Sequence, residues 1–113
     1  MRAPHAVLLD LDPVYDLQPR LRLAVDRVLP VPPLPRWLCP VAQAARALRF
    51  LRRHLPRPCL VFTGSGDYHY LTALLIRRVR EPFTLILVDR HADEEDDWGP
   101  GLLSCGGWIR RAR

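Results

Sequence analysis

Acidic and histidine side chains gather in two short segments of the sequence, GSGDYHY and DRHADEEDD, each of which follows an apolar run. The second segment places Asp89, His91 and Asp93 two residues apart, a spacing that projects side chains to one side of extended backbone. Two carboxylates and an imidazole suit a divalent cation such as Mn²⁺, which can lower the pKa of a bound water and supply hydroxide at neutral pH. The first segment adds Asp67 and His69 after a glycine turn. We therefore expect the five side chains to converge on one small volume, with His69, Asp89, His91 and Asp93 as the candidate metal ligands. The competing interpretation is that acids and histidines gather in loops because loops are solvated.

Three apolar runs are expected to form the strands that position these segments, at residues 6–11, 59–63 and 83–88. Residues 41–55 and 70–80 carry apolar side chains at the spacing of an amphipathic helix. Strands that alternate with helices are typical of a parallel α/β sheet with right-handed crossovers, and strands that are apolar throughout favour helices on both faces. The sequence therefore predicts a three-layer α/β/α fold. Ligands bind beyond the carboxyl ends of the strands in such sheets, which is where both polar segments fall.

Composition limits the class of protein. The chain has 113 residues, the length of a single domain over residues 1–113. Its basic residues are all arginine, which excludes enzymes that need a P-loop or Schiff-base lysine. The arginines are spread over several segments and no apolar stretch approaches the ~20 residues that span a bilayer, so neither nucleic acid nor a membrane is expected as a partner. Three cysteines without a CxxC pair, and only a short apolar run near the first residue, predict a cytoplasmic protein without a secretory signal.

The two polar segments also carry a family resemblance. GSGDYHY and LILVDRHAD are similar to the strand ends GGDHS and DAHxD of the arginase/ureohydrolase family, and the later SCGGW resembles a glycine-containing loop that lines that family's substrate site. The resemblance covers roughly residues 59–108. It implies a hydrolase with two Mn²⁺ ions that cleaves C–N bonds of small guanidino or amidine substrates. Ser104, Cys105 and Gly106 would then lie at the substrate.

Matching positions give each candidate ligand a role in that resemblance. It implies that His69 binds one metal, that Asp89 bridges both, that His91 binds the second metal and that Asp93 returns to the first. The family has Asp and His adjacent, whereas Tyr68 separates them here. The family completes its site with a second Asp-x-Asp pair on later strands that this sequence does not contain. We therefore expect a truncated or partial arginase-like domain, possessing one metal ion or none, that is an incomplete or inactive member; no catalytic residue is assigned.

Two other functions stay open. LLDLDPV resembles the first motif of haloacid-dehalogenase-like phosphatases, which would make Asp10 the nucleophile and Asp12 the general acid/base. In that interpretation Thr63 supplies the second-motif hydroxyl. The acidic magnesium ligands would be Asp96 and Asp97. The third function is a non-catalytic α/β binding or interaction domain, in which exposed sheet edges favour self-association into a homo-oligomer.

Overall fold

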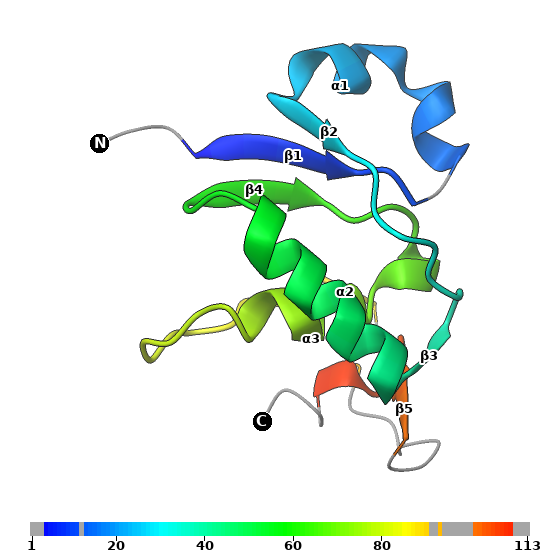
Figure 1. Cartoon of the computed structure of the whole chain (residues 1–113), viewed down its shortest axis with the longest axis vertical. Coiled ribbons are helices and arrows are strands. Elements are labelled where there is room, and N and C mark those ends of the chain that lie inside the picture. Colours follow the sequence, from blue (N-terminus) through cyan, green and yellow to red (C-terminus); the bar gives the residue numbers. More distant parts are fainter. Residues whose placement is uncertain (1–3, 12, 91–92, 94–100, 110–113) are drawn as a thin grey trace.

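Strand β1 (His5–Leu9) is the centre of a three-stranded parallel sheet, with β2 (Arg27–Leu29) on one side and β4 (Cys59–Phe62) on the other (Figure 1). The computed structural model describes residues 4–11, 13–90, 93 and 101–109. The last three residues of β1 are fully buried, because the strand has neighbours on both edges. All three strands run in the same direction, so their carboxyl ends share one edge of the sheet. The first two expected strands are therefore confirmed, and the chain that follows β4 leaves the sheet at the expected edge.

A second, smaller sheet pairs β3 (Leu38–Pro40) with β5 (Leu102–Ser104) in antiparallel register. Cys39 lies opposite Leu103, and both side chains are buried. This pairing brings residues 102–104 next to the start of the helix that begins at Val41. There the Val41 N–H donates to the Gly101 carbonyl at 2.8 Å. Strands of three residues inside proline- and glycine-rich chain give little apolar periodicity, so the sequence did not predict this sheet.

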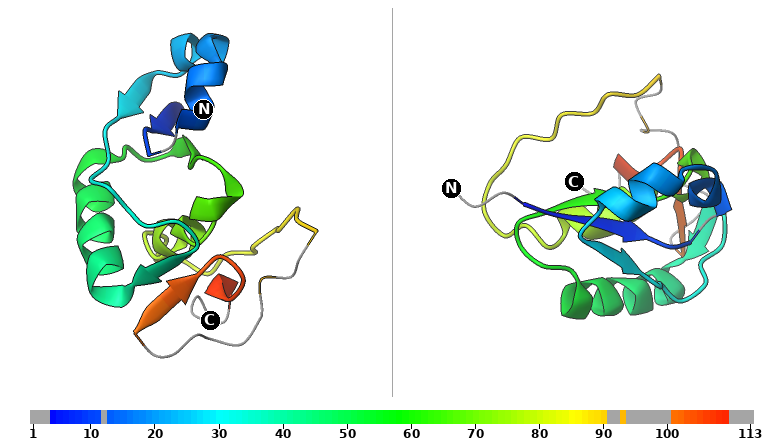
Figure 2. Two further views of the ribbon diagram at one scale, coloured as in Figure 1. Left: turned by 90° about the vertical axis from the view of Figure 1, so that its right-hand side faces the viewer. Right: turned by 90° about the horizontal axis from the view of Figure 1, so that it is seen from above.

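Helix α2 (Val41–His54) matches the helix predicted from the apolar spacing. It buries Ala44, Leu48 and Leu51 against the sheet and ends after a turn rich in cationic side chains, which suits the negative end of the helix dipole. Leu55 then adopts extended backbone, as the residue before a proline tends to do. The position of α2 on one side of the molecule, with residues 83–88 on the other, is visible in both views of Figure 2.

Four shorter helical elements complete the fold. The η1 turn (Pro13–Leu17) and α1 (Pro19–Ala24) connect β1 to β2, and η2 (Gly66–Tyr68) precedes α3 (Leu71–Ile76). The helix expected over residues 70–80 is thus shorter than predicted. The chain turns directly after Ile76 and buries Arg78. The periodicity of the sequence did not indicate this burial.

One hydrophobic cluster extends through both sheets and the helices between them. Its members come from β1, β2, β3, α2, α3, β5 and the final turn. The largest fully buried side chains are Trp108, Tyr70, Leu8, Leu9, Leu51 and Leu71. The two sheets therefore share a core and do not pack as separate units.

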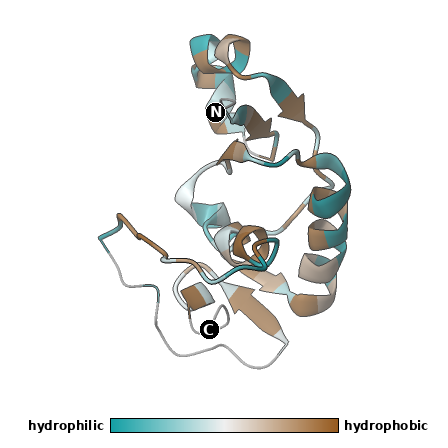
Figure 3. Cartoon of the chain, turned by 90° about the vertical axis from the view of Figure 1, so that its left-hand side faces the viewer, coloured by the Kyte–Doolittle hydropathy of each residue, from teal (hydrophilic) through white to brown (hydrophobic). Residues whose placement is uncertain are grey.

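The strand expected at residues 83–88 is wrong for this structure. The segment is extended but pairs with no strand among the described residues. Most of its apolar side chains face solvent, with Ile86 82% exposed and Val88 95% exposed, whereas Leu87 packs against the core. The run protrudes from the body in Figure 3. An apolar run of this length forms a strand only when a neighbouring edge accepts its hydrogen bonds, and here the segment does not pair with the free edge of β4.

A parallel sheet joined by helices places the molecule in the α/β class. In the ranges given above, no helix has the length and apolar character to cross a bilayer.

Candidate metal centre

His69 is positioned by a tight turn at the carboxyl end of β4. The turn uses Gly64 with φ 95°, a backbone conformation that side chains with a Cβ rarely adopt. The Gly64 N–H donates to the Tyr15 hydroxyl at 2.6 Å, which ties the turn to η1. The chain then enters η2, and the His69 N–H donates to the Gly66 carbonyl at 3.1 Å. His69 therefore lies on a short helical turn with both sides of its backbone hydrogen-bonded.

Two carboxylates meet the imidazole of His69. Its Nδ1 lies 3.2 Å from Oδ2 of Asp89 and 3.2 Å from Oδ2 of Asp93. One ligand atom from each of the three residues lies within 4.8 Å of the other two. The side chain of Asp93 is only 5% exposed, whereas that of His69 is 29% exposed. One nitrogen and two carboxylate oxygens in this volume are a donor set that fits a divalent cation of the Mn²⁺ or Zn²⁺ type.

Asp93 is held by the final turn of the described chain. The Trp108 indole N–H donates to Asp93 Oδ2 at 2.8 Å, and the Ile109 N–H donates to the Asp93 carbonyl at 3.1 Å. Asp93 has φ 55°, a left-handed conformation that aspartate tolerates better than most residues. The His69 and Trp108 rings are 5.5 Å apart. Trp108 therefore orients an acid of the cluster, a role that the sequence analysis missed; the signal was available, because a buried indole N–H usually finds an acceptor.

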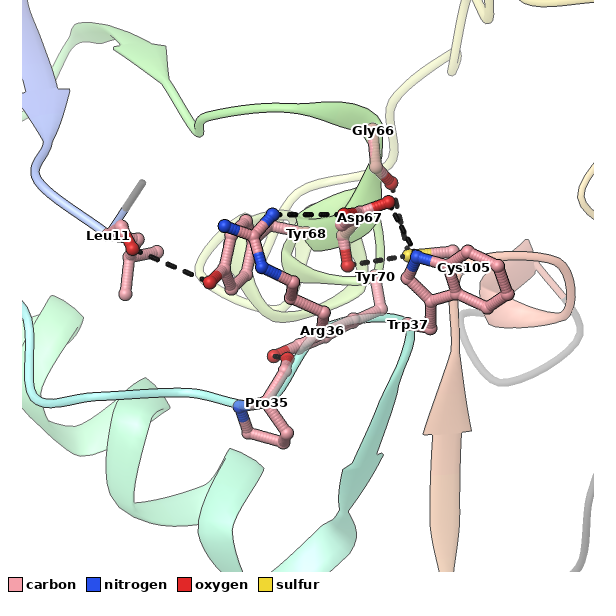
Figure 4. Close-up of polar contacts among 9 residues, drawn as sticks. All are labelled: Leu11, Pro35, Arg36, Trp37, Gly66, Asp67, Tyr68, Tyr70 and Cys105. Carbon is pink, nitrogen blue, oxygen red and sulfur yellow. Dashed lines mark hydrogen bonds and ion pairs between the residues drawn. The ribbon is translucent and has the colours of Figure 1, made fainter. Parts of the chain in front are cut away.

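The structure brings together three of the five side chains expected at the site. His91 lies outside the described residues. Asp67 belongs to a different set of contacts, shown in Figure 4: its carboxylate accepts from the Trp37 indole at 2.6 Å and from the Arg36 guanidinium at 2.9 Å. The expectation that Asp67 joins the cluster is therefore wrong. Two ordered donors already occupy its oxygens, so it serves the loop and not the cation.

The contacts of Asp67 clamp three distant segments together. Its carbonyl accepts from the Trp37 N–H at 2.8 Å and from the Cys105 thiol at 3.1 Å, while the Cys105 N–H donates to the Trp37 carbonyl at 2.9 Å. Trp37 has φ 70°, which is strained for a bulky residue and persists because these bonds fix it. The clamp fixes the loop two residues before His69.

Ser104, Cys105 and Gly106 line one cavity of about 410 Å³, together with Trp37 and Asp67. Ser104 is buried, and its hydroxyl accepts from the Gly107 N–H at 3.0 Å, so it stabilises the turn. Burial raises the pKa of the Cys105 thiol, which keeps it protonated and able to donate to carbonyls. Segments 66–69 and 104–108 thus contribute both to this cavity and to the surroundings of the His69 cluster. A role in substrate binding stays a prediction.

The residues expected for phosphatase chemistry are placed differently. The Asp10 carboxylate accepts from the Arg22 guanidinium at 3.3 Å in an exposed pair between β1 and α1. Asp12, Asp96 and Asp97 lie outside the described residues. Thr63 lines a groove between β4 and α3 that also contains His69. Nothing among these contacts favours Asp10 as a nucleophile.

Fold and cluster together define an α/β protein with a candidate metal centre at the carboxyl end of a parallel strand. The chain is 28% identical over 114 residues to an uncharacterized protein of Thermotoga maritima. The match covers 99% of this chain and 45% of that protein, so the chain spans less than half the length of the curated relative it matches. No family model matches the chain, and no solved structure matches it.

Proposed function

We propose that the chain is the metal-binding part of a hydrolase of the arginase/ureohydrolase type, which acts on C–N bonds of small guanidino or amidine substrates and uses Mn²⁺. A three-layer arginase-like architecture, of which the described sheet would be one part, belongs to the same proposal. So does a site that is half of the family's two-metal centre, built from His69, Asp89, Asp93 and His91.

One observation carries the proposal: the imidazole of His69 and the carboxylates of Asp89 and Asp93 converge although 24 residues separate the first from the last. The tendency of polar residues to gather in solvated loops does not explain this arrangement, because Asp93 is among the few buried charged residues of the described chain. Burying a carboxylate is unfavourable unless partners compensate it, and Trp108 with His69 supplies only one donor each. A divalent cation would add the missing positive charge.

In this proposal each residue of the cluster has a different role toward a bound cation. A divalent cation held by these residues would supply an activated water and polarise the bond to be cleaved. Asp93, fixed by the Trp108 indole, keeps one oxygen aimed at the cluster. His69 would offer Nδ1, which lies 3.2 Å from a carboxylate oxygen of each acid, as a nitrogen ligand. Asp89 would bind the cation through Oδ2, which lies 3.2 Å from the His69 Nδ1.

The direct test is a titration of Mn²⁺ into the metal-free protein, followed by the loss of the free-ion signal in electron paramagnetic resonance. The wild type is compared with Asp93→Asn and with a matched control, Asp16→Asn, an exposed acid on η1. We expect saturable binding in the wild type and the control, and a loss of at least about tenfold in affinity for Asp93→Asn, as is usual when a ligand or its support is removed.

Equal affinity in all three proteins would show that Mn²⁺ binds to scattered surface acids, and no binding in the millimolar range would remove the metal centre altogether. Hydrolysis of guanidino compounds is assayed separately, because a half site can bind the ion without turning over substrate.

A further inference from the structure

A groove of about 650 Å³ runs between β4 and α3, and the His69 side chain forms part of its wall. Thr63 and Thr72 lie at the end near His69, since both are next to the carboxyl end of β4 and the start of α3. The middle of the wall is apolar, with Val61 on β4 and two α3 side chains. The other end lies at the first residue of β4. With about 3.3 Å per residue, four residues of strand separate the two ends by about 13 Å.

Arg78 lines the far end of this groove although it is one of the most buried charged residues, with 8% of its surface exposed. Its guanidinium donates to the Leu55 carbonyl at 2.9 Å, at the end of α2, and lies 3.8 Å from the Cys59 sulfur. Within the part of the chain that the structure describes, none of the ion pairs includes Arg78. A carbonyl and a weakly accepting thiol satisfy few of the five N–H donors of a guanidinium. None of the Arg78 nitrogens is both buried and without a hydrogen-bond partner, so its remaining donors are open to the groove.

A buried cation without an acid is costly unless another group compensates it. Arg57 also lines this end of the groove, and the acid there is Glu81, which forms no ion pair with either arginine within the described ranges. Two arginines against one glutamate leave this end with a net positive charge. The groove is therefore cationic at one end, apolar in the middle and lined by hydroxyls and an imidazole at the other.

We infer that the groove is a binding site for an elongated small molecule whose carboxylate contacts Arg78 and whose apolar stem lies along Val61 toward His69. A carboxylate is planar and accepts two N–H bonds from one guanidinium, which would give Arg78 the acidic partner that the described residues do not supply. That the reacting group of such a ligand lies at the His69 end rests on the proposed function. The binding of the carboxylate does not.

The experiment uses octanoate and its neutral analogue octanamide as probes, measured by calorimetric titration in the presence of EDTA so that no metal can bind the carboxylate. We expect octanoate to bind wild-type protein at least about tenfold more tightly than octanamide, the difference expected for a charge-assisted hydrogen bond. Arg78→Gln should remove that preference and leave octanamide binding unchanged. The control is Arg80→Gln, an exposed arginine outside the groove, which should bind both probes as the wild type does.

Because Arg78 also donates to the carbonyl of Leu55, the residue that follows α2, thermal unfolding of Arg78→Gln is recorded first. If that variant does not fold, the comparison of the two probes on the wild type decides. Equal affinity for octanoate and octanamide overturns the inference, and so does a loss of octanoate binding in Arg80→Gln that equals the loss in Arg78→Gln. The Mn²⁺ titration is independent: octanoate preference without Mn²⁺ binding leaves the anion site and removes the metal proposal, and the converse removes only the anion site.

Discussion

The contact between Trp108 and Asp93 shows how one hydrogen bond can set the geometry of the cluster. The indole N–H and the carboxylate are both buried, and their distance is 2.8 Å. A carboxylate held in this way cannot rotate freely, so Oδ2, the oxygen that accepts from the indole, also keeps a fixed relation to the His69 Nδ1. Residues that orient a ligand in this manner commonly matter almost as much as the ligands themselves.

Replacement of Trp108 by phenylalanine tests this role. Trp108→Phe keeps an aromatic ring in the core but removes the donor, so we expect Mn²⁺ affinity to fall by about tenfold. The free energy of unfolding should fall by about 1–3 kcal/mol, because a buried acceptor loses its partner. Trp37→Phe is the control: it removes the indole bond to Asp67 but keeps the main-chain bonds of residue 37 that hold the loop before His69. Equal Mn²⁺ affinities for the two variants, measured by paramagnetic resonance, would contradict an orienting role for Trp108.

Two buried acidic groups predict how stability responds to alkaline pH. Burial raises the pKa of the Cys39 thiol from 9.0, and burial together with the neighbouring thiols raises the pKa of Tyr70 above 10.0. Above pH 9 the unfolded chain loses protons that the folded chain retains, so the folded state is progressively disfavoured as pH rises. The stability that these groups contribute is complete below pH 9 and declines above it by at most about 1.4 kcal/mol per pH unit for each group.

Urea unfolding at about pH 7.5 and about pH 10.5 measures this decline. In Tyr70→Phe the decline above pH 10 should be shallower than in the wild type, since the phenol is gone. A wild-type stability that stays constant across this interval, or a Tyr70→Phe curve parallel to that of the wild type, would show that the two groups do not titrate differently in the folded chain.

At the scale of elements, α2 carries much of the packing between the two sheets. Leu51 on its inner face is fully buried, whereas the adjacent Arg52 faces solvent. Leu51→Ala should lower the free energy of unfolding by about 2–5 kcal/mol through lost burial and a residual cavity. Arg52→Ala should change it by less than about 0.5 kcal/mol. Urea unfolding of both variants provides the measurement, and similar losses for the two would mean that α2 does not pack through the Leu51 face.

This helix and the segment at 83–88 show what the sequence could and could not predict. The α2 pattern is local, because fourteen consecutive residues contain the spacing of an apolar face and a cationic face. The helix can therefore be predicted from periodicity alone. A strand needs a partner, and the run FTLILV contains no information on whether the β4 edge accepts it. The same limit hid the β3–β5 pair, whose three-residue strands lie 64 positions apart and are too short to show alternation.

The candidate site divides in the same way. Histidine and acids next to the carboxyl end of a strand pointed to His69, Asp89 and Asp93, and the structure brings these three together. The diversion of Asp67 to Arg36 and Trp37 could not be anticipated, since those residues lie in a proline-rich connection without periodicity. Trp108 reaches Asp93 only because the final turn packs into the shared core. Side chains that depend on long-range packing were the ones that the sequence left undecided.

For the molecule as a whole, the exposed apolar run at residues 83–88 predicts self-association. Extended, unpaired apolar segments are templates for pairing with another chain. We expect sedimentation velocity to show concentration-dependent association of the wild type, and Ile86→Asp to weaken it. The variant should unfold within about 0.5 kcal/mol of the wild type, because Ile86 is 82% exposed.

A single exposed leucine on α1 supplies the control for that experiment. Leu23 is 87% exposed, so Leu23→Asp changes charge and hydrophobicity by the same amount at a different place. It should leave association unchanged. If both variants weaken association equally, general hydrophobicity accounts for the effect and the 83–88 segment has no special part in it.

The contact of His69 with Asp89 joins the two ends of the stretch that contains α3 and the exposed run. In polymer terms residues 70–88 form a closed loop, and the entropic cost of closing a loop rises only slowly with its length. A cation bound at the junction adds its binding free energy to that closure, about 2.7 kcal/mol when its concentration is a hundred times the dissociation constant. The ion would then act as a clasp. How often the apolar run is released, and how quickly a protease cuts within it, would follow the concentration of free divalent ion.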